Sequence, residues 1–153
     1  KTTFLSTLCG KASYGETTGT VLINGRPTPV NHYRNIVGFV PQEDVMHRDL
    51  TVKENLTFSG YTRLPRNWTA EQIREHVNAV IIALGLDEIR HSRIGDEDVR
   101  GISGGQRKRV NIGLELVADP TLLFLDEPTT GLDAASCKSV CNSLRQVAEN
   151  GLT

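Results

Sequence analysis

Two adjacent carboxylates, Asp126 and Glu127, follow the apolar run Leu-Leu-Phe-Leu at residues 122–125. Such a run is typical of a strand covered on both faces of a sheet, and ligands of open α/β sheets bind beyond the carboxyl ends of the strands. Two carboxylates placed there repel each other, and Mg²⁺, which prefers oxygen ligands, would relieve that repulsion. The pair predicts a cation site with one carboxylate near the metal and the other aligning a water molecule, although a solvated acid pair is the alternative.

The opening residues Lys1, Thr2 and Thr3 fit the end of a phosphate-binding loop of the pattern G-x-x-x-x-G-K-[ST]. In such loops the lysine reaches the β- and γ-phosphates and the hydroxyl holds Mg²⁺. A helix at residues 2–9 would direct its positive N-terminal end towards the phosphates. Lys-Thr-Thr alone is common by chance, so the prediction rests on its combination with the acid pair. We therefore expect the two ends of the chain to form one site.

A second candidate for phosphate binding is the peptide Ile-Ser-Gly-Gly-Gln at residues 102–106. A serine and two glycines at the start of a helix form a nest of N–H groups that suits an anion. A flexible loop is the alternative, but the basic residues after it and the 23 residues from Ser103 to Asp126 (126 − 103) argue against it. The run Arg107, Lys108, Arg109 is too short for a nucleic-acid patch, and we interpret it as a solvated helix face.

The elements that must hold these residues alternate between strands and helices. Strands are predicted at residues 20–24, before an Asn-Gly turn, and at 36–40, ended by Pro41. Helical spacing covers residues 51–86, with a capping box at Thr69 and Gln72, and helices are also expected after residue 105 and at 134–149. The pattern predicts an α/β catalytic core, at about residues 1–50 and 107–153, with a helical subdomain at 51–106.

Composition is that of an ordinary soluble domain. The chain has 153 residues, 38% of them hydrophobic and 23% charged, with a net charge of −1. One domain fits this length, and the charge balance gives no reason to expect nucleic acid as a partner. No apolar run approaches the roughly 20 residues of a membrane helix. Three cysteines favour a reducing compartment without a disulfide framework.

Taken together, the motifs resemble the nucleotide-binding domain of ABC transporters. Residues 1–3 resemble the end of the Walker A loop, 39–42 the Q-loop, 102–106 the signature motif, 122–127 the Walker B strand and 131–133 the D-loop. They occur in the family's order over the whole chain. The resemblance implies a P-loop NTPase (RecA-like) core with an antiparallel β portion and a helical signature subdomain. It also implies ATP and Mg²⁺ as ligands.

Finer detail resembles the G subfamily, the pigment- and sterol-type half transporters. It lies in residues 39–60, in Arg63-Leu64-Pro65 and in residues 99–133. In that subfamily the nucleotide-binding domain precedes a membrane domain in the same chain, and two half transporters pair. The resemblance therefore implies a second nucleotide-binding domain, in a homo- or heterodimer, and a transmembrane domain as partners. It places this domain on the cytoplasmic face of a membrane.

The resemblance assigns roles at the nucleotide. Lys1 would contact the β/γ-phosphates and Thr3 the α-phosphate. Thr2 would ligate Mg²⁺, and Asp126 would bind the metal directly or through water. Glu127 would be the catalytic base or would position the attacking water.

Further roles follow for the remaining motifs. Gln42 would contact the metal and the attacking water as a catalytic residue, and would couple the site to the membrane domain. The signature residues would cap the γ-phosphate of ATP held by the partner subunit: Ser103, Gly104, Gly105 and Gln106. Asp133 would act across the dimer interface.

Three family features lie outside the sequence: the Walker A glycines, the adenine-stacking aromatic and the switch histidine, since all four histidines precede Glu127. We interpret the chain as a domain truncated at both ends and expect residues 1–153 alone to be inactive. The predicted function is the ATP-hydrolysing motor of a transporter that exports lipids, sterols or other hydrophobic compounds. A soluble ABC ATPase of the translation-factor type is the alternative.

Overall fold

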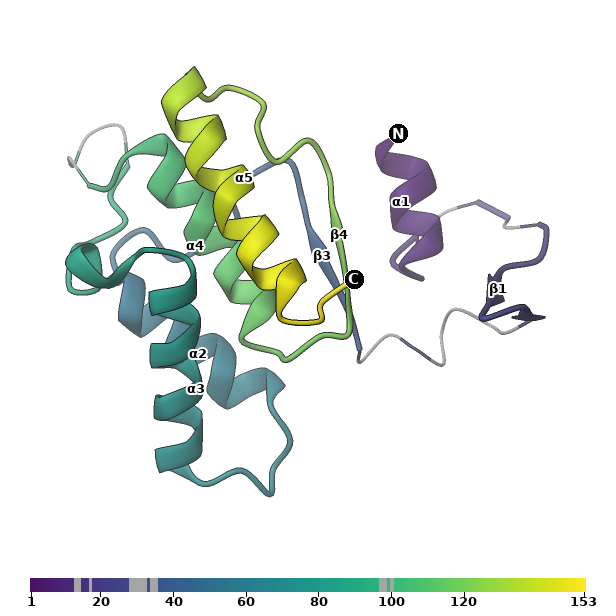
Figure 1. Cartoon of the computed structure of the whole chain (residues 1–153), viewed down its shortest axis with the longest axis horizontal. Coiled ribbons are helices and arrows are strands. Elements are labelled where there is room, and N and C mark those ends of the chain that lie inside the picture. Colours follow the sequence, from purple (N-terminus) through teal and green to yellow (C-terminus); the bar gives the residue numbers. More distant parts are fainter. Residues whose placement is uncertain (13–14, 17, 28–32, 34–35, 97–98, 100) are drawn as a thin grey trace.

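The computed structural model describes residues 1–12, 15, 16, 18–27, 33, 36–96, 99 and 101–153. Strands and helices alternate as the sequence predicts, and a helical stretch separates the last two strands (Figure 1). In chain order they are α1 (Thr2–Leu8), β1 (Leu22–Ile23), β2 (Arg26–Pro27), β3 (Val37–Val40), α2 (Val52–Arg63), α3 (Ala70–Ala83), the 3-10 helix η2 (Asp87–Ile89), α4 (Gly104–Leu116), β4 (Leu122–Leu125) and α5 (Ala134–Glu149).

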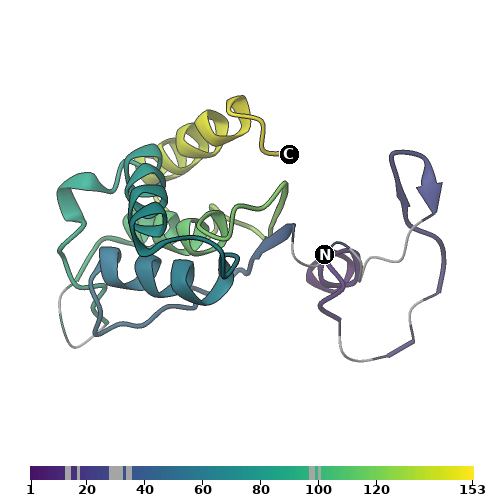
Figure 2. The same cartoon turned by 90° about the horizontal axis from the view of Figure 1, so that it is seen from below.

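The predicted Asn-Gly turn joins β1 and β2 into a short antiparallel hairpin. Asn24 and Gly25 both have positive φ, at 50° and 76°, which is the geometry that a two-residue hairpin turn requires. β1 has two residues, fewer than the predicted strand at 20–24, and β2, also of two residues, was not predicted. The hairpin projects beyond α1, away from the helices α2–α5 (Figures 1 and 2).

The strands β3 and β4 pair in parallel, in a register that sets Val37 opposite Leu122 and Val40 opposite Leu125. Because successive side chains of a strand point to opposite faces, Leu123 and Leu125 pack on the core of helices while Leu122 and Phe124 point the other way. Among the described helices, α1 lies on that second side (Figure 2). Leu123 is buried and the other three residues of β4 are half-buried, so both faces of the strand are covered at least in part.

One apolar core joins β3 and β4 with all four helices α2–α5. Three of these helices begin with capping boxes, in which a side-chain oxygen and a backbone N–H bond reciprocally across the first turn. The box at Thr69 and Gln72 was predicted, whereas the boxes at Thr51 with Glu54 and at Ser103 with Gln106 were not. The division into a catalytic core and a helical subdomain remains a prediction, because both parts share this core.

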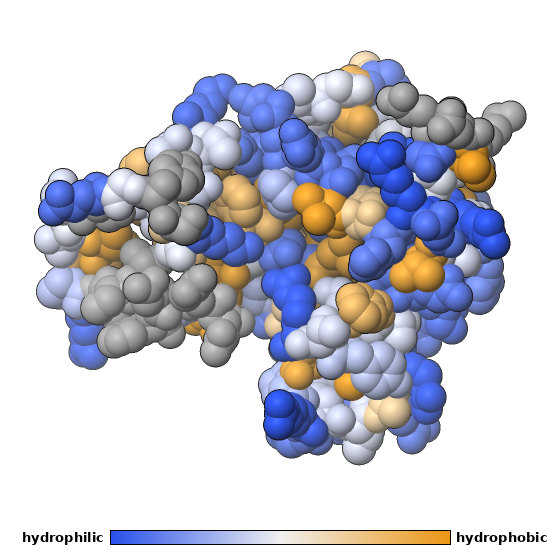
Figure 3. Space-filling model, turned by 180° about the vertical axis from the view of Figure 1, so that it is seen from behind, coloured by the Kyte–Doolittle hydropathy of each residue, from blue (hydrophilic) through white to orange (hydrophobic). Residues whose placement is uncertain are grey.

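Large apolar side chains also reach the surface. On the face seen in Figure 3 apolar residues form separate patches among polar ones. Within the described residues, no helix combines the length and apolar character needed to cross a bilayer. The most exposed large apolar residues are Phe4, Val45, Ile82, Leu22, Phe58, Val99 and Tyr61.

Candidate functional site

The carboxyl ends of β3 and β4 lie side by side, since Val40 and Leu125 are partners in register. The pairing continues one residue further, where the Asp126 N–H donates to the Val40 carbonyl at 3.0 Å. Gln42 follows β3 by two residues, and Asp126 and Glu127 follow β4 directly. The structure therefore brings three predicted site residues to the edge of the sheet where ligands of α/β folds bind.

Lys1 and Glu127 meet at this edge although 126 residues separate them. The Lys1 ammonium donates to Glu127 Oε1 at 3.1 Å, and the Thr130 hydroxyl donates to Oε2 at 3.1 Å. These hydrogen bonds, that of Lys1 first, hold the pKa of Glu127 below its ordinary value, so the carboxylate is ionised at neutral pH. The predicted phosphate-binding cation and the predicted water-aligning carboxylate thus share one exposed site.

The Glu127 backbone adopts a left-handed conformation, with φ of 50°. For a residue with a side chain this conformation costs roughly 1–2 kcal/mol. A bond from the Thr130 N–H to the Glu127 carbonyl, at 3.2 Å, stabilises the turn. Strain held in place by its surroundings is common at functional sites, and here it sets the direction in which the Glu127 side chain leaves the strand.

Asp126 is buried, with 3% of its surface exposed. Its Oδ2 atom has no hydrogen-bond partner, which is costly for a buried carboxylate oxygen. A cation or a metal-bound water would satisfy that atom, so the residue fits the predicted Mg²⁺ site. No cluster of three or more metal-ligating side chains occurs in the described part of the chain, but Mg²⁺ commonly keeps water and takes one or two carboxylates.

Thr2 and Thr3 form the exposed first turn of α1, directly after Lys1. Lys1 occupies the N-cap position and makes no side-chain capping bond. The first N–H groups of this helix have no side-chain acceptor from the cap. The Thr3 carbonyl accepts from the Thr7 hydroxyl at 2.8 Å, so Thr3 takes part in the helix through its backbone.

The signature peptide forms the start of α4. Ser103 Oγ accepts from the Gln106 N–H at 3.3 Å, and Gln106 Oε1 accepts from the Ser103 N–H at 2.8 Å. Ser103 and Gly104 are exposed, whereas Gly105 is buried against Ser136 of α5. The side chain of Gln106 is thus engaged in capping, while the Ser103 hydroxyl can still donate its proton to an anion.

The signature peptide and the Lys1–Glu127 site are not joined within this chain. Among the described residues, no hydrogen bond or ion pair links residues 103–106 to Lys1, Asp126 or Glu127. In Figure 1 α1 and the start of α4 lie on opposite sides of β4. The two predicted phosphate-binding elements are therefore separate surfaces.

Asp133 begins α5, and its carboxylate accepts from the N–H groups of Ala135 and Ser136 at 3.1 and 3.2 Å. Hydrogen bonds from Ser136 are the main cause that lowers the pKa of Asp133. Its position in the structure is that of an exposed helix cap. The predicted role across a dimer interface remains a prediction.

The interpretation of residues 107–109 as a solvated face is wrong for Lys108, which is 4% exposed. Its ammonium contacts Asp44 Oδ1 at 2.7 Å and donates to the Gln42 carbonyl at 2.8 Å. Asn111, one turn later, also contacts this loop. Sequence reasoning missed Asp44, Lys108 and Asn111, and the spacing of three between Lys108 and Asn111 was the available signal that they share a helix face.

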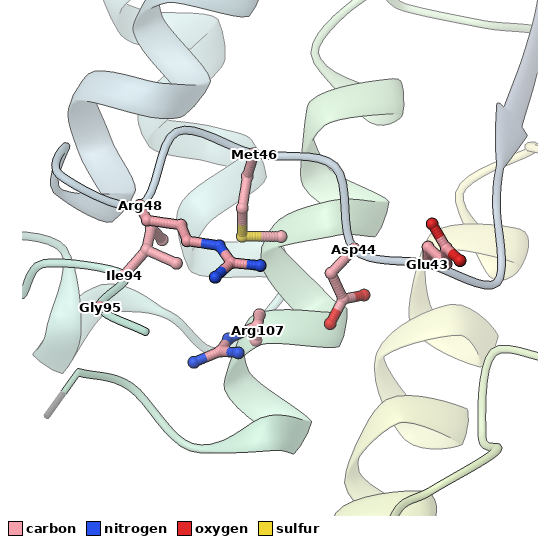
Figure 4. A pocket seen from close by; sticks show the side chains of 7 residues that line it. All are labelled: Glu43, Asp44, Met46, Arg48, Ile94, Gly95 and Arg107. Atoms are coloured by element: carbon pink, nitrogen blue, oxygen red, sulfur yellow. The ribbon is translucent and has the colours of Figure 1, made fainter. Parts of the chain in front are cut away.

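A hollow of about 320 Å³ lies beside the same loop (Figure 4). The guanidinium groups of Arg48 and Arg107 both point into it, near Met46 and Asp44. Neither Lys1 nor Glu127 lines it, so this hollow is distinct from the site at the strand ends.

Comparison with known proteins decides the family. The family model described as "ABC transporter" matches residues 1–130. The chain belongs to the ABC transporter family. The fold agrees: the structure of cbiO1 from Clostridium perfringens, part of the ABC transporter complex cbiONQ, superposes with a TM-score of 0.79 at 23% identity, covering 99% of this chain and 59% of that chain.

Curated relatives place this ABC domain with the G subfamily. It is 52% identical to putative white-brown complex homolog protein 30 and 49% identical to ABC transporter G family member 28, both of Arabidopsis thaliana, over 99% of its length. It is 44% identical over its whole length to the broad substrate specificity ATP-binding cassette transporter ABCG2 of Rattus norvegicus. The chain spans 14% of the two plant proteins and 23% of the rat protein.

Proposed function

We propose that this domain binds and hydrolyses ATP as the motor of a G-type membrane transporter. The observation that carries the proposal is the contact of Lys1 with Glu127, at 3.1 Å, at the carboxyl ends of β3 and β4. Lys1 would hold the β/γ-phosphates and Thr3 the α-phosphate. The phosphates would compete with Glu127 for the Lys1 ammonium and release the carboxylate to act on the attacking water.

Mg²⁺ is the metal that this site would hold. The buried, unpartnered Oδ2 of Asp126 supports it, and Thr2 and Gln42 would supply further oxygen atoms. The ion would neutralise charge on the phosphates as the γ-phosphoryl group leaves. The residues of the chain contribute mainly by positioning and by charge stabilisation.

A second nucleotide-binding domain would complete the site. Ser103 is exposed and its hydroxyl proton is not used by the cap, which supports a role in binding the γ-phosphate of ATP held by a partner. Gly104 beside it is also exposed, and Asp133 would approach the interface from the start of α5. The separation of the signature peptide from Lys1 in one chain supports a site shared by two chains, whether identical or not.

The transported compound and the membrane domain belong to the whole protein. Similarity to G-subfamily proteins over 99–100% of the chain supports a half transporter with this domain on the cytoplasmic side. Lipids, sterols or other hydrophobic molecules are the cargo class that we propose. The same similarity does not favour a soluble translation-type ATPase.

The test is the substitution Glu127→Gln in the full-length protein. We expect kcat for ATP hydrolysis to fall by ~10²–10⁴-fold, because the general base is lost, while ATP stays bound. Glu149→Gln, at an exposed position of α5, is the matched control and should hydrolyse ATP at the wild-type rate. Wild-type turnover in the Glu127→Gln protein would remove Glu127 from the proposed role.

A further inference from the structure

Lys108 is a buried lysine on the helix that begins with the signature peptide. Only 5% of its side chain is exposed, and it extends from α4 to the loop after β3. Its ammonium meets Asp44 Oδ1 at 2.7 Å and the main-chain carbonyl of Gln42 at 2.8 Å. The contact with Gln42 is to the backbone, so the Gln42 side chain stays exposed and available for another partner.

Asn111, one turn further along α4, makes further hydrogen bonds to the same loop. It is 3% exposed, and its amide donates to the carbonyls of Pro41 and Glu43 and to Asp44 Oδ1, at 3.4–3.5 Å. Two side chains of α4 therefore contact every residue from 41 to 44. This stretch lies outside regular secondary structure, so these contacts fix the position of its backbone.

A buried ammonium is costly to desolvate, and an apolar side chain of similar volume often stabilises a fold as well or better. Stability alone is therefore a weak reason for a lysine at this position. A lysine can do what an apolar side chain cannot: its ammonium binds one particular carbonyl and one particular carboxylate, and so fixes their positions relative to each other. In this protein that carbonyl is the main-chain carbonyl of Gln42.

We propose that Lys108, with Asp44, is a positioning residue that holds Gln42 at the nucleotide site and ties it to the signature helix. Lys108 lies five positions after Ser103 on one rigid helix, and Gln42 lies two residues beyond the strand that pairs with β4. Movement of the signature peptide against a partner is thereby transmitted to Gln42. This inference rests on the proposed ATPase function.

The test is Lys108→Met in the full-length protein, with steady-state ATP hydrolysis measured against both MgATP and free Mg²⁺. We expect kcat to fall about 10-fold and the Mg²⁺ concentration for half-maximal activity to rise several-fold, while KM for MgATP changes less than about 2-fold. The nucleotide would still be held by Lys1 and Thr2. The double variant Lys108→Met with Asp44→Asn should be no slower than Lys108→Met, since both act through one contact.

Arg145→Met is the matched control, because Arg145 belongs to an exposed ion pair with Glu149 on α5. It should leave kcat and the Mg²⁺ dependence unchanged. Wild-type kcat and Mg²⁺ dependence in folded Lys108→Met would overturn the inference, as would equal loss of kcat and MgATP affinity together with a lower melting temperature. The wild-type protein, assayed alongside, separates the two proposals: if it hydrolyses ATP and Lys108→Met hydrolyses it equally well, only the positioning role fails. If the wild-type protein does not hydrolyse ATP, the proposed ATPase function fails.

Should Lys108→Met not fold, Asp44→Asn decides the question. Asparagine keeps an acceptor for Lys108 at the same place but removes the charge. We expect kcat to fall about 3-fold with an unchanged KM for MgATP. An unchanged kcat in this variant would then overturn the positioning role.

Discussion

Gly104 and Gly105 are neighbours in the first turn of α4, but their surroundings differ. A methyl group at Gly105 would lie 2.8 Å from the Ser136 Cβ atom, closer than two carbon atoms can approach. A methyl group at Gly104 would lie 3.6 Å from Leu132, which is an ordinary contact. Gly105 is therefore required for the packing of α4 on α5, whereas no contact among the described residues requires Gly104 to be a glycine. That freedom supports the proposed role of Gly104 in contacting a partner's nucleotide.

We predict that Gly105→Ala lowers the free energy of unfolding by about 1–3 kcal/mol, because overpacking forces α4 and α5 apart. Gly104→Ala should change the free energy of unfolding by less than about 1 kcal/mol, because its methyl group meets no clash and alanine favours the helix more than glycine does. Urea denaturation of the two variants measures both values. The double variant Gly105→Ala with Ser136→Gly removes the clash and should recover stability. Equal stability of the two single variants would contradict the packing argument.

At the scale of elements, one half-buried ion pair joins α2, α4 and β3. Arg63 of α2 bonds both carboxylate oxygens of Glu115 of α4, at 2.7 and 2.9 Å, and Glu115 Oε2 accepts from the Phe39 N–H of β3 at 3.0 Å. Burial raises the pKa of Glu115, but the hydrogen bonds and charge of Arg63, with the Phe39 N–H, offset it. The pKa of the folded state lies below the ordinary value of 4.5.

Glu115→Gln should therefore lower the free energy of unfolding at neutral pH, and the loss should be smaller at acidic pH. A carboxylate whose pKa is lowered by folding contributes stability above its ordinary pKa and loses that contribution as pH falls through the folded pKa. We expect the wild-type protein to exceed the variant by about 1–3 kcal/mol near pH 7 and the difference to shrink towards pH ~3. Urea denaturation across this pH range measures it. A gap that is constant with pH would contradict the prediction, and Glu149→Gln, at an exposed pair, should show no such trend.

At the scale of the whole molecule, the signature peptide and the strand-end site face different ways. The start of α4, which Ser103 caps, lies on one side of β4, and the N-terminus with α1 lies on the other (Figure 1). A single chain of this shape does not bring its own Ser103 to the nucleotide that its own Lys1 would hold. The geometry supports catalysis by two domains, in which the signature peptide of each domain completes the nucleotide site of the other.

We predict that the full-length Glu127→Gln protein associates more tightly through its nucleotide-binding domains when MgATP is present, because ATP is bound but not cleaved. Cross-linking between single cysteines placed at the exposed position 104 and near residue 2, in a background without native cysteines, measures the approach. Adding Ser103→Arg, whose bulk blocks the interface, should abolish the ATP-dependent cross-link. A cross-link that is independent of ATP, or that survives Ser103→Arg, would contradict the shared site.

Much of the local structure follows from short-range signals. The α5 bounds at residues 134–149, the Asn-Gly turn at 24–25 and the capping box at Thr69 are set by neighbours within a few residues, and sequence periodicity or turn chemistry reveals them. Lys108 illustrates the opposite case. The basic run at residues 107–109 predicts a solvated helix face, but in the fold Asp44 and the Gln42 carbonyl contact its middle residue. That environment comes from residues more than 60 positions away.

The sequence by itself determined the family motifs and their order, because these depend on residue type and spacing. It also predicted which residues would hold phosphate and metal. Only the tertiary structure decided that Lys1 meets Glu127, that β3 and β4 pair in parallel, and that Lys108 of α4 bonds to the loop bearing Gln42. Each of these facts depends on which distant segments pack together. Burial, ion pairing and the space around a glycine are properties of that packing, and no single stretch of the sequence contains them.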